Sequence, residues 1–219
     1  MYSLLIFDWD GTIIDSTARI ISSMQRAAVD VGLLRPEDEA VCEIIGLGLP
    51  EALRAVFPLI QAPQIERMKE RYAFYYIEGD STPVALFPYV RETLESLHAK
   101  GYRLAVATGK NRRGLDRVLA QTKLGHLFEI TRCADETTSK PDPHMLHEIL
   151  AHTGVAPEAA IMVGDTEFDM DMGRRAGVGR IAVSYGAHHI DRLYQYDPLL
   201  SMHQFNELEH WLTTKGDHA

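Results

Sequence analysis

Cysteine is scarce in this sequence, and the few that occur exclude a disulfide framework and a cysteine-based metal site. Cys42 and Cys133 lie far apart among 219 residues and in no metal-ligand spacing. Such usage suits a reducing compartment in which neither thiol needs a partner. We therefore expect both cysteines to be small buried apolar residues.

Long hydrophobic runs and a basic leader are also lacking. Residues 1–7 begin an apolar run, but Asp8 and Asp10 interrupt it before a signal-peptide core could form. No apolar stretch approaches the length that a membrane span needs. The sequence thus predicts a cytoplasmic protein without a membrane partner.

Positive charge is in short supply as well. There are 22 lysines and arginines against 31 acidic residues, which gives a net charge of −9 and opposes a general nucleic-acid surface. A hydrophobic fraction of 46% is that of an ordinary globular protein, and 219 residues suffice for one sizeable core with an insertion. We expect no nucleic-acid partner, and a monomer or weak homodimer.

Short β-rich runs alternate with helical patterns through most of the chain. Each run is nearly continuous in apolar residues, as expected for parallel strands covered by helices on both faces. This predicts an α/β fold with a doubly wound, Rossmann-like parallel sheet and functional loops at the carboxyl ends of the strands. Expected strands are 3–7, 103–107, 128–131, 160–163 and 180–183; expected helices are 90–100, 112–121, 143–152 and 203–213; 215–219 are expected to form a loose tail.

Between residues 15 and 83 the pattern is helical, with no convincing strand. This predicts an inserted α-helical cap domain of residues 16–82 within a core domain formed by 1–15 and 83–219. Because the insertion follows the first strand, we expect it to lie over that strand's carboxyl end. Helical periodicity covers 17–31, 37–45, 50–56 and 64–77, and turn residues gather at 15–17 and 79–83.

Two of the predicted strands end in acidic residues. Asp8 and Asp10 follow the first strand in the segment FDWDGT, and Asp165 and Asp169 follow a later strand in VGDTEFD. Buried unpaired carboxylates are costly, and a divalent cation compensates them while it also holds a substrate phosphate. A polar turn or a helix cap explains either site alone, but not readily both in one chain.

Two further segments carry groups suited to phosphate. Thr108, Gly109 and Lys110 end a strand, where a hydroxyl and backbone donors at a helix start bind phosphate oxygens, although a helix cap has the same pattern. Lys140 stands before two prolines that stiffen its loop, although a solvated lysine is the common alternative. Each feature is weak by itself.

Together, and in this order, the four pieces resemble the haloacid dehalogenase superfamily. The family pattern has an acid-x-acid-x-threonine loop, a threonine or serine at a strand end, a lysine, and a glycine-aspartate motif with a further aspartate. The resemblance covers most of the chain. The matching residues are Asp8, Asp10, Thr12, Thr108, Lys140, Gly164, Asp165 and Asp169.

This resemblance implies a magnesium-dependent phosphatase with an aspartyl-phosphate intermediate. Asp8 is implied as the nucleophile and Asp10 as the acid/base, and the backbone carbonyl of Asp10 joins the carboxylates that hold Mg²⁺. Asp169 is implied as a ligand or as support. The implied sets are catalytic Asp8, Asp10, Thr108 and Lys140; metal-binding Asp8, Asp10, Asp165 and Asp169; and substrate-binding Thr12, Thr108, Gly109, Lys110 and Lys140, with Gly46 and Leu47 from the insertion.

The insertion also resembles, more loosely, the small cap of the phosphoglycolate phosphatase-like subgroup. Asp15 and Ser16 look like that subgroup's entry segment, and the segment GLGLP at 46–50 looks like its specificity loop. An interhelical turn would also use glycine and proline there. The resemblance implies a small phosphorylated, phosphoglycolate-like substrate whose leaving group is chosen by the cap.

Several related functions stay open at this point. A sugar phosphomutase, a pyrophosphatase or a nucleotidase would share the core motifs, and a non-catalytic binding or regulatory module could keep the fold. A dehalogenase does not need Asp10. A phosphonate hydrolase needs a cap lysine for a Schiff base, and the insertion offers Lys69 alone. A phosphate-responsive receiver domain has similar acids without the insertion.

The remaining polar and aromatic residues have simpler explanations. The aromatic residues within 72–76 are expected mainly to form a packing face, with a tyrosine hydroxyl at the substrate as the alternative. Three arginines of the insertion either bind a substrate anion or are solvated helix charges, as is usual. We expect surface positions for the histidines, because no cysteine set accompanies them as zinc ligands. The arginines are Arg54, Arg67 and Arg71, and the histidines are His144, His147, His188 and His189.

Overall fold

Six parallel strands form the main sheet of the protein, whose computed structural model describes residues 2–216. Their order is β5-β4-β1-β6-β7-β8, so β1 lies in the interior of the sheet, between β4 and β6. The sequence predicted all of them except β8, whose three residues are too few for a periodic signal. The bounds are β1 Leu4–Phe7, β4 Arg103–Thr108, β5 Phe128–Cys133, β6 Ala160–Gly164, β7 Gly179–Val183 and β8 Leu200–Met202.

Side chains of β1 alternate between two apolar cores, one on each face of the sheet. Leu5 and Phe7 share a buried cluster with α5, α6 and α10, whereas Leu4 and Ile6 share another with α7 and α8. All four are fully buried, which explains the continuous apolar run in the sequence. The helices are α5 Val90–Ala99, α6 Arg112–Thr122, α7 His144–Thr153, α8 Glu167–Ala176, α9 Ile190–Leu193 and α10 Glu207–Gly216.

The C-terminal helix differs from its prediction at both ends. It was expected over 203–213 and instead runs from Glu207 to Gly216. The tail predicted at 215–219 is therefore wrong for its first two residues, which end the helix, and 217–219 lie outside the described residues. The first turn holds Glu207, whose carboxylate accepts from the backbone N–H of His203 and of Gln204. These contacts fix a turn before the helix, where periodicity alone placed helix.

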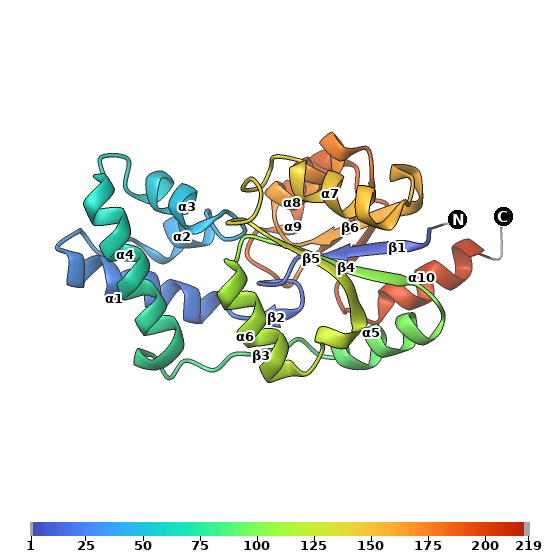
Figure 1. Cartoon of the computed structure of the whole chain (residues 1–219), viewed down its shortest axis with the longest axis horizontal. Coiled ribbons are helices and arrows are strands. Elements are labelled where there is room, and N and C mark those ends of the chain that lie inside the picture. Colours follow the sequence, from blue (N-terminus) through green and yellow to red (C-terminus); the bar gives the residue numbers. More distant parts are fainter. Residues whose placement is uncertain (1, 217–219) are drawn as a thin grey trace.

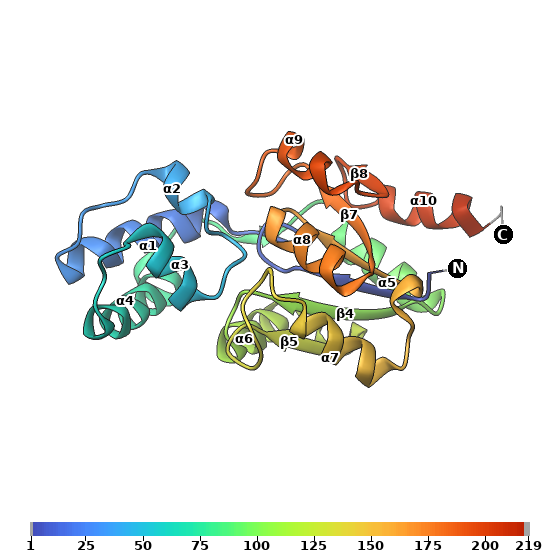
Figure 2. The same ribbon diagram turned by 90° about the horizontal axis from the view of Figure 1, so that it is seen from above.

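Four helices and a π-helical turn gather at one end of the molecule, beside the carboxyl end of β1 (Figures 1 and 2). We call these elements the cap. The cap has its own apolar core, in which Met24, Leu53 and Met68 are buried. Its boundaries as a separate domain stay a prediction. The elements are α1 Thr17–Val31, α2 Asp38–Cys42, α3 Leu49–Val56, α4 Ala62–Phe74 and the π-helical turn η1 Tyr75–Gly79.

The chain enters and leaves the cap through two segments that lie side by side. Strands β2, Ile14–Asp15, and β3, Ala85–Leu86, pair antiparallel, a contact too short to be foreseen from the sequence. The guanidinium of Arg19 on α1 donates to the carbonyls of Thr82 and Tyr76. The returning segment is thereby tied to the first cap helix. No described helix combines the length and apolar character needed to cross a membrane.

Candidate active site

The loops after β1, β4 and β6 meet at the carboxyl edge of the sheet. They do so because β1 pairs in parallel with both β4 and β6. Asp8, Thr108 and Asp165 follow or end these strands and are therefore brought together from distant parts of the chain. Lys140 arrives from the loop before α7. The four motifs recognised in the sequence thus occupy one place.

Three carboxylates are buried together at this edge. One oxygen from each of Asp8, Asp165 and Asp169 lies within 4.8 Å of the others. Lys140 Nζ lies 2.7 Å from Asp8 Oδ1 and 2.7 Å from Asp169 Oδ1, and its side chain is fully buried. One ammonium against three carboxylates leaves an excess of buried negative charge. A divalent cation with oxygen ligands meets that electrostatic demand.

The pKa directions of these groups express the same charge excess. Burial raises the pKa of Asp8 well above its usual range; Lys140 opposes this, while the carboxylates of Asp169 and Asp165 add to it. Burial, reinforced by Asp169, raises the pKa of Asp165 to about 7. Burial lowers the pKa of Lys140, but Asp169 and Asp8 outweigh it and the net shift is upward. Lys140 therefore stays charged among acids that lack sufficient counter-charge.

Backbone conformation and two donors hold Asp165 in position. Gly11 has φ of +78°, and a Cβ there would lie 2.1 Å from Asp165 Oδ2. A side chain at this position would therefore collide with the carboxylate. Thr12 Oγ1 donates to Asp165 Oδ1 at 2.8 Å, and the backbone N–H of Ala187 donates to Oδ2 at 2.8 Å. Thr12 thus supports a carboxylate in the structure.

Asp169 and Asp8 differ in how many of their oxygens are occupied. Asp169 Oδ2 accepts from the hydroxyl of Thr166 at 2.7 Å and from the backbone N–H of Thr166 at 3.0 Å, and these contacts cap the start of α8. Asp169 Oδ1 contacts Lys140. Both Asp169 oxygens are therefore engaged. Asp8 Oδ2 is buried and has no hydrogen-bond partner among the described residues. This buried oxygen therefore lacks the hydrogen-bonding or positively charged partner that a buried carboxylate needs.

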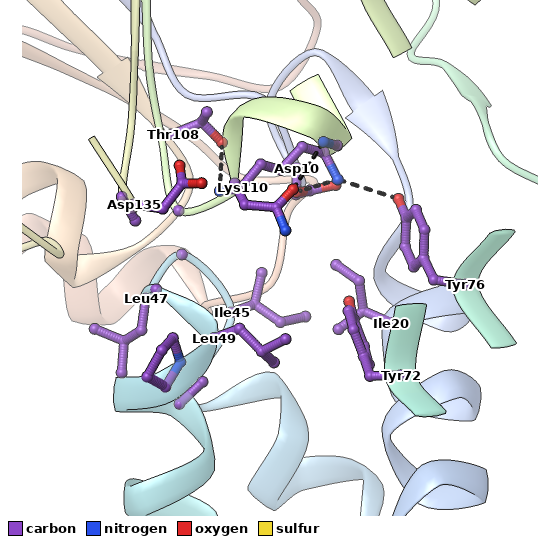
Figure 3. A pocket seen from close by; sticks show the side chains of 18 of the residues that line it. Asp10, Ile20, Ile45, Leu47, Leu49, Tyr72, Tyr76, Thr108, Lys110 and Asp135 are labelled. Atoms are coloured by element: carbon purple, nitrogen blue, oxygen red, sulfur yellow. Dashed lines mark hydrogen bonds and ion pairs between the residues drawn. The ribbon is translucent and has the colours of Figure 1, made fainter. Parts of the chain in front are cut away.

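The carboxylate of Asp10 lies outside the acidic cluster and faces the entrance to the cap. Lys110 Nζ lies 2.9 Å from Asp10 Oδ2, and the hydroxyl of Ser16 donates to Oδ1 at 2.6 Å. The ammonium of Lys110 also donates to the hydroxyl of Tyr76 at 3.3 Å (Figure 3). Burial lowers the pKa of Lys110, but Asp10 and the tyrosines outweigh it and raise the pKa overall. Sequence reasoning did not find this network.

A loop of the cap rests directly on the end of β4. A Cβ at Gly109 would lie 2.4 Å from the carbonyl oxygen of Gly46 and 2.6 Å from that of Leu47. The N–H of Gly48 donates to Ser139 Oγ at 2.8 Å. The cap residues predicted at the site are therefore in contact with the predicted phosphate-binding strand end.

A cavity of about 470 Å³ extends from Asp8 and Asp10 to the cap (Figure 3). Five predicted substrate-binding residues line it, whereas Thr12 and Lys140 do not. Both of these are buried, and Thr12 contacts Asp165 while Lys140 contacts Asp8. The lining residues from the predicted set are Gly46, Leu47, Thr108, Gly109 and Lys110.

One histidine contradicts its predicted surface position. His188 is 2% exposed, accepts at Nδ1 from the backbone N–H of Glu167, and packs edge-on against Phe168. The loop after β7 carries it over the start of α8, an arrangement that a sequence of neighbouring histidines does not reveal. The expectation was right for His144, His147 and His189, which are exposed.

Several cap side chains also differ from expectation. Tyr75 is buried as predicted, but Phe74 is 42% exposed, so the packing-face prediction is wrong for it. Tyr72 and Tyr76 line the cavity. Cys42 is only half-buried rather than buried. Cys133 is buried as expected, and none of Arg54, Arg67 and Arg71 lines the cavity.

Fold and site together define an α/β protein with a buried acidic centre under a cap. Residues 5–183 match the haloacid dehalogenase-like hydrolase family. The chain is 32% identical over 197 residues to the phosphoglycolate phosphatase of Haemophilus influenzae, covering 86% of this chain and 88% of that protein. It is 32% identical over 213 residues to "Probable phosphatase IndB" of Dickeya dadantii, covering 95% and 92%.

Among solved structures, the crystal structure of a predicted phosphoglycolate phosphatase from Haemophilus somnus has a TM-score of 0.87 at 26% identity. It covers 96% of this chain and 98% of its own. The chain therefore belongs to the haloacid dehalogenase-like hydrolase family. The predicted family and fold class and the assignment as a phosphatase-type enzyme are confirmed.

Proposed function

We propose that the protein is a Mg²⁺-dependent phosphatase that hydrolyses a small phosphorylated metabolite through a phosphoryl group carried on Asp8. The observation that supports this most directly is the orphaned oxygen of Asp8, within a buried cluster of acids that opens on a cavity beside Asp10 and Thr108. The relatives named as phosphoglycolate phosphatases make phosphoglycolate the first substrate to test.

The donor set suits the proposed cation. Asp8 and Asp165 would hold Mg²⁺ with the backbone carbonyl of Asp10, and Asp169, whose Oδ1 contacts Lys140, would orient that lysine and support the ligands. When bound, Mg²⁺ supplies the positive charge that offsets repulsion between a carboxylate and a phosphate. The excess of buried negative charge in the cluster fits such an ion.

In the first half-reaction, Asp8 attacks the phosphorus atom. A bond forms from the Asp8 carboxylate to phosphorus while the bond from phosphorus to the leaving oxygen breaks. Lys140 fixes one Asp8 oxygen and places positive charge beside the transferred group. The hydroxyl of Thr108, which accepts from the backbone N–H of Lys110 at 3.2 Å, and the backbone N–H of Gly109 would donate to phosphate oxygens. Positioning and charge supply most of the rate enhancement in such reactions.

Asp10 would carry the proton in both half-reactions. It would protonate the leaving oxygen and then take a proton from the water that hydrolyses the intermediate. Ser16 and Lys110 occupy its two oxygens, so one contact has to open before Asp10 exchanges a proton. Both contacts reach toward the cap, so its movement would couple to this release. The Asp10→Asn variant tests the role, and normal rates of both half-reactions in it would exclude a proton shuttle.

The test is phosphate release from phosphoglycolate, hexose phosphates, nucleotides, pyrophosphate and an aryl phosphate, with Mg²⁺ or EDTA. We expect release that EDTA stops and that Asp8→Asn abolishes. Conversion of a hexose phosphate to an isomer without phosphate release would identify a mutase instead. A preference for nucleotides or pyrophosphate would select those alternatives. Absence of turnover for every compound would favour a binding or regulatory module.

A further inference from the structure

The cavity is larger than a two-carbon leaving group requires. Its volume is about 470 Å³, and cavities of about 300–1,000 Å³ accommodate drug-sized ligands. The phosphoryl end would lie at Asp8, because that residue and Asp10 form the deep end of the cavity. Most of the remaining space therefore faces the cap, and the cap wall decides which leaving group fits.

The cap wall of this cavity is mainly apolar. Ile20 from α1, Ile45 and Leu47 from the loop before α3, and Leu49 at the start of α3 line the cavity (Figure 3). An apolar wall gains free energy from burying apolar surface, whereas a carboxylate or sugar hydroxyl placed against it loses hydration without a partner. The wall thus favours a hydrocarbon body over a polar one.

Two tyrosine rings stand opposite that apolar loop. The centroids of Tyr72 and Tyr76 lie 5.8 Å apart with their planes tilted by 30°, and both side chains face the cavity (Figure 3). The hydroxyl of Tyr76 is already engaged by Lys110. Aromatic pairs gain stabilisation beyond area burial when they stack with an offset or meet edge to face. A planar ring between Tyr72 and Leu49 would make an aromatic contact with Tyr72 and an aliphatic contact with Leu49.

The cations that line the cavity differ in whether they are paired with an acid. Lys69 is the one cation that the described cap residues contribute to the lining, and its ammonium pairs with Glu66 at 2.9 Å. Lys110 pairs with Asp10. Arg113 and Arg117 on α6 also line the cavity, from the core side, and make no ion pair with a described residue. Any second anionic group of a substrate, besides the phosphate, would therefore lie at α6.

From these observations we infer that the enzyme selects phosphate monoesters whose leaving group carries a planar apolar ring, such as an arylalkyl alcohol. This rests on the proposed phosphatase function and names its substrate class. The wall of Ile45 and Leu49 and the ring of Tyr72 would enclose the leaving group, and the phosphate would lie at Asp8 and Thr108.

The test compares kcat/KM for 2-phenylethyl phosphate, ethyl phosphate and phosphoglycolate with Mg²⁺. The first two release alcohols of similar acidity, so their ratio reports binding of the ring rather than leaving-group reactivity. We expect 2-phenylethyl phosphate to exceed ethyl phosphate by about 10- to 100-fold, the range for burying one apolar side-chain-sized group. We also expect it to exceed phosphoglycolate.

A charge placed on the cap wall should reverse this preference. Leu49 is half-buried and faces the cavity, so Leu49→Arg should lower kcat/KM for 2-phenylethyl phosphate and raise it for phosphoglycolate. Leu59→Arg is the matched control, because Leu59 is 88% exposed and does not line the cavity. Inhibition by inorganic phosphate should stay unchanged in both variants and shows that the phosphate end is intact. Tyr72→Ala provides a second variant should Leu49→Arg fold poorly.

The outcomes separate this inference from the proposed function. Phosphoglycolate preferred by the wild type would overturn the substrate class and leave the phosphatase standing. Loss of that preference in Arg117→Ala would place the recognised anion at α6 instead. Equal values for ethyl and 2-phenylethyl phosphate would also overturn the inference. If no phosphate monoester releases phosphate with Mg²⁺, the proposed function fails and the inference fails with it.

Discussion

The two ends of the cavity differ in the polarity of the side chains that line them. At the core end, acids and lysines are largely buried and several of them are paired, as Lys140 is with Asp8 and Asp169, while Asp8 Oδ2 has no partner among the described residues. At the cap end, the wall consists of aliphatic side chains and tyrosine rings. Charged catalytic side chains have to be held in a fixed geometry, and the rigid backbone at the ends of the strands holds them there. Apolar selection needs only shape and area, so it leaves no charge pattern in the sequence.

Few polar contacts join the two ends, and each is specific. The cap loop rests on Gly109, and Ser16 contacts Asp10. Arg192 on α9 pairs with Glu43 of the cap at 2.5 Å and also with Glu167 of α8. Changes in the core should therefore affect chemistry, changes at these contacts should affect alignment, and changes in the cap wall should affect substrate choice.

The largest effect should come from the core nucleophile. Asp8→Asn should lower kcat by roughly 10⁴-fold or more, as removal of a catalytic nucleophile does elsewhere, while the fold stays intact. Asp191→Asn is the control, because Asp191 carries the same change on an exposed side chain outside the cluster. Steady-state phosphate release and circular dichroism measure the two quantities. Residual activity within tenfold of wild type would remove Asp8 from the chemistry.

An intermediate effect should come from the contact between the ends. Gly109→Ala places a Cβ 2.4 Å from the Gly46 carbonyl, so the cap loop has to move. Misplacement of about 1 Å near reacting groups costs up to about 100-fold, and we expect a 10- to 100-fold loss in kcat/KM. The control is Gly125→Ala, whose nearest neighbour, Leu119 Cβ, lies 3.7 Å away. Equal behaviour of the two variants would show that the loop contact is not needed.

The charge excess at the core end should make the chelated protein sensitive to pH. Burial raises the folded-state pKa of Asp165 to about 7 from an ordinary 3.8. Such a group contributes stability that is present below its unfolded pKa and is lost as the pH rises through about 7. The free energy of unfolding in EDTA should therefore fall between pH 5 and pH 8, and fall less in Asp165→Asn.

Mg²⁺ should reverse that loss, because it binds the ionised acids of the folded state. At about 100 times its dissociation constant, it should add about 2.7 kcal/mol to the free energy of unfolding. Denaturant titrations at both pH values with and without Mg²⁺ measure this. A pH dependence that is identical in wild type and Asp165→Asn would assign it to other groups.

The smallest effect should come from the ion pair across the two ends. Arg192 is 36% exposed, and exposed ion pairs contribute about 0.2–1 kcal/mol, so Arg192→Ala should change KM by at most about fivefold. Arg174→Ala is the matched control, because Arg174 pairs with Asp171 on its own helix. A change in KM of the same size in both variants would show that the ion pair between Arg192 and Glu43 does not help to hold the cap.

The core end was readable from the sequence because its signals are local. Asp8, Thr108 and Asp165 each stand directly at the end of an apolar run, and parallel strands bring such ends together. The contacts that connect them were not readable, because they depend on tertiary packing. The hydrogen bond from Ser16 to Asp10 and that from Lys110 to Tyr76 join residues whose spacing in the sequence follows no recognisable pattern.

The cap end was predicted as helices and little more. α1 was expected at its observed bounds, because it is long and periodic and ends at Gly32 in the left-handed conformation. The helix predicted at 64–77 instead ends at Phe74 and continues as a π-helical turn, which turns Tyr76 toward Lys110. β8 and α9 were missed because three or four residues carry no period. The sequence does not show which apolar residues line a cavity, because that depends on how the helices pack.

The most direct test of the account is the covalent state of Asp8 during turnover. The enzyme is mixed with an aryl phosphate and Mg²⁺ and quenched in acid. Its proteolytic peptides are then analysed by mass spectrometry. Because an aryl leaving group needs little protonation, Asp10→Asn should still form the intermediate but hydrolyse it slowly. We predict one phosphoryl group on Asp8 in the wild type and more of it in Asp10→Asn. Turnover in both enzymes with no phosphoryl group on Asp8 would contradict the account.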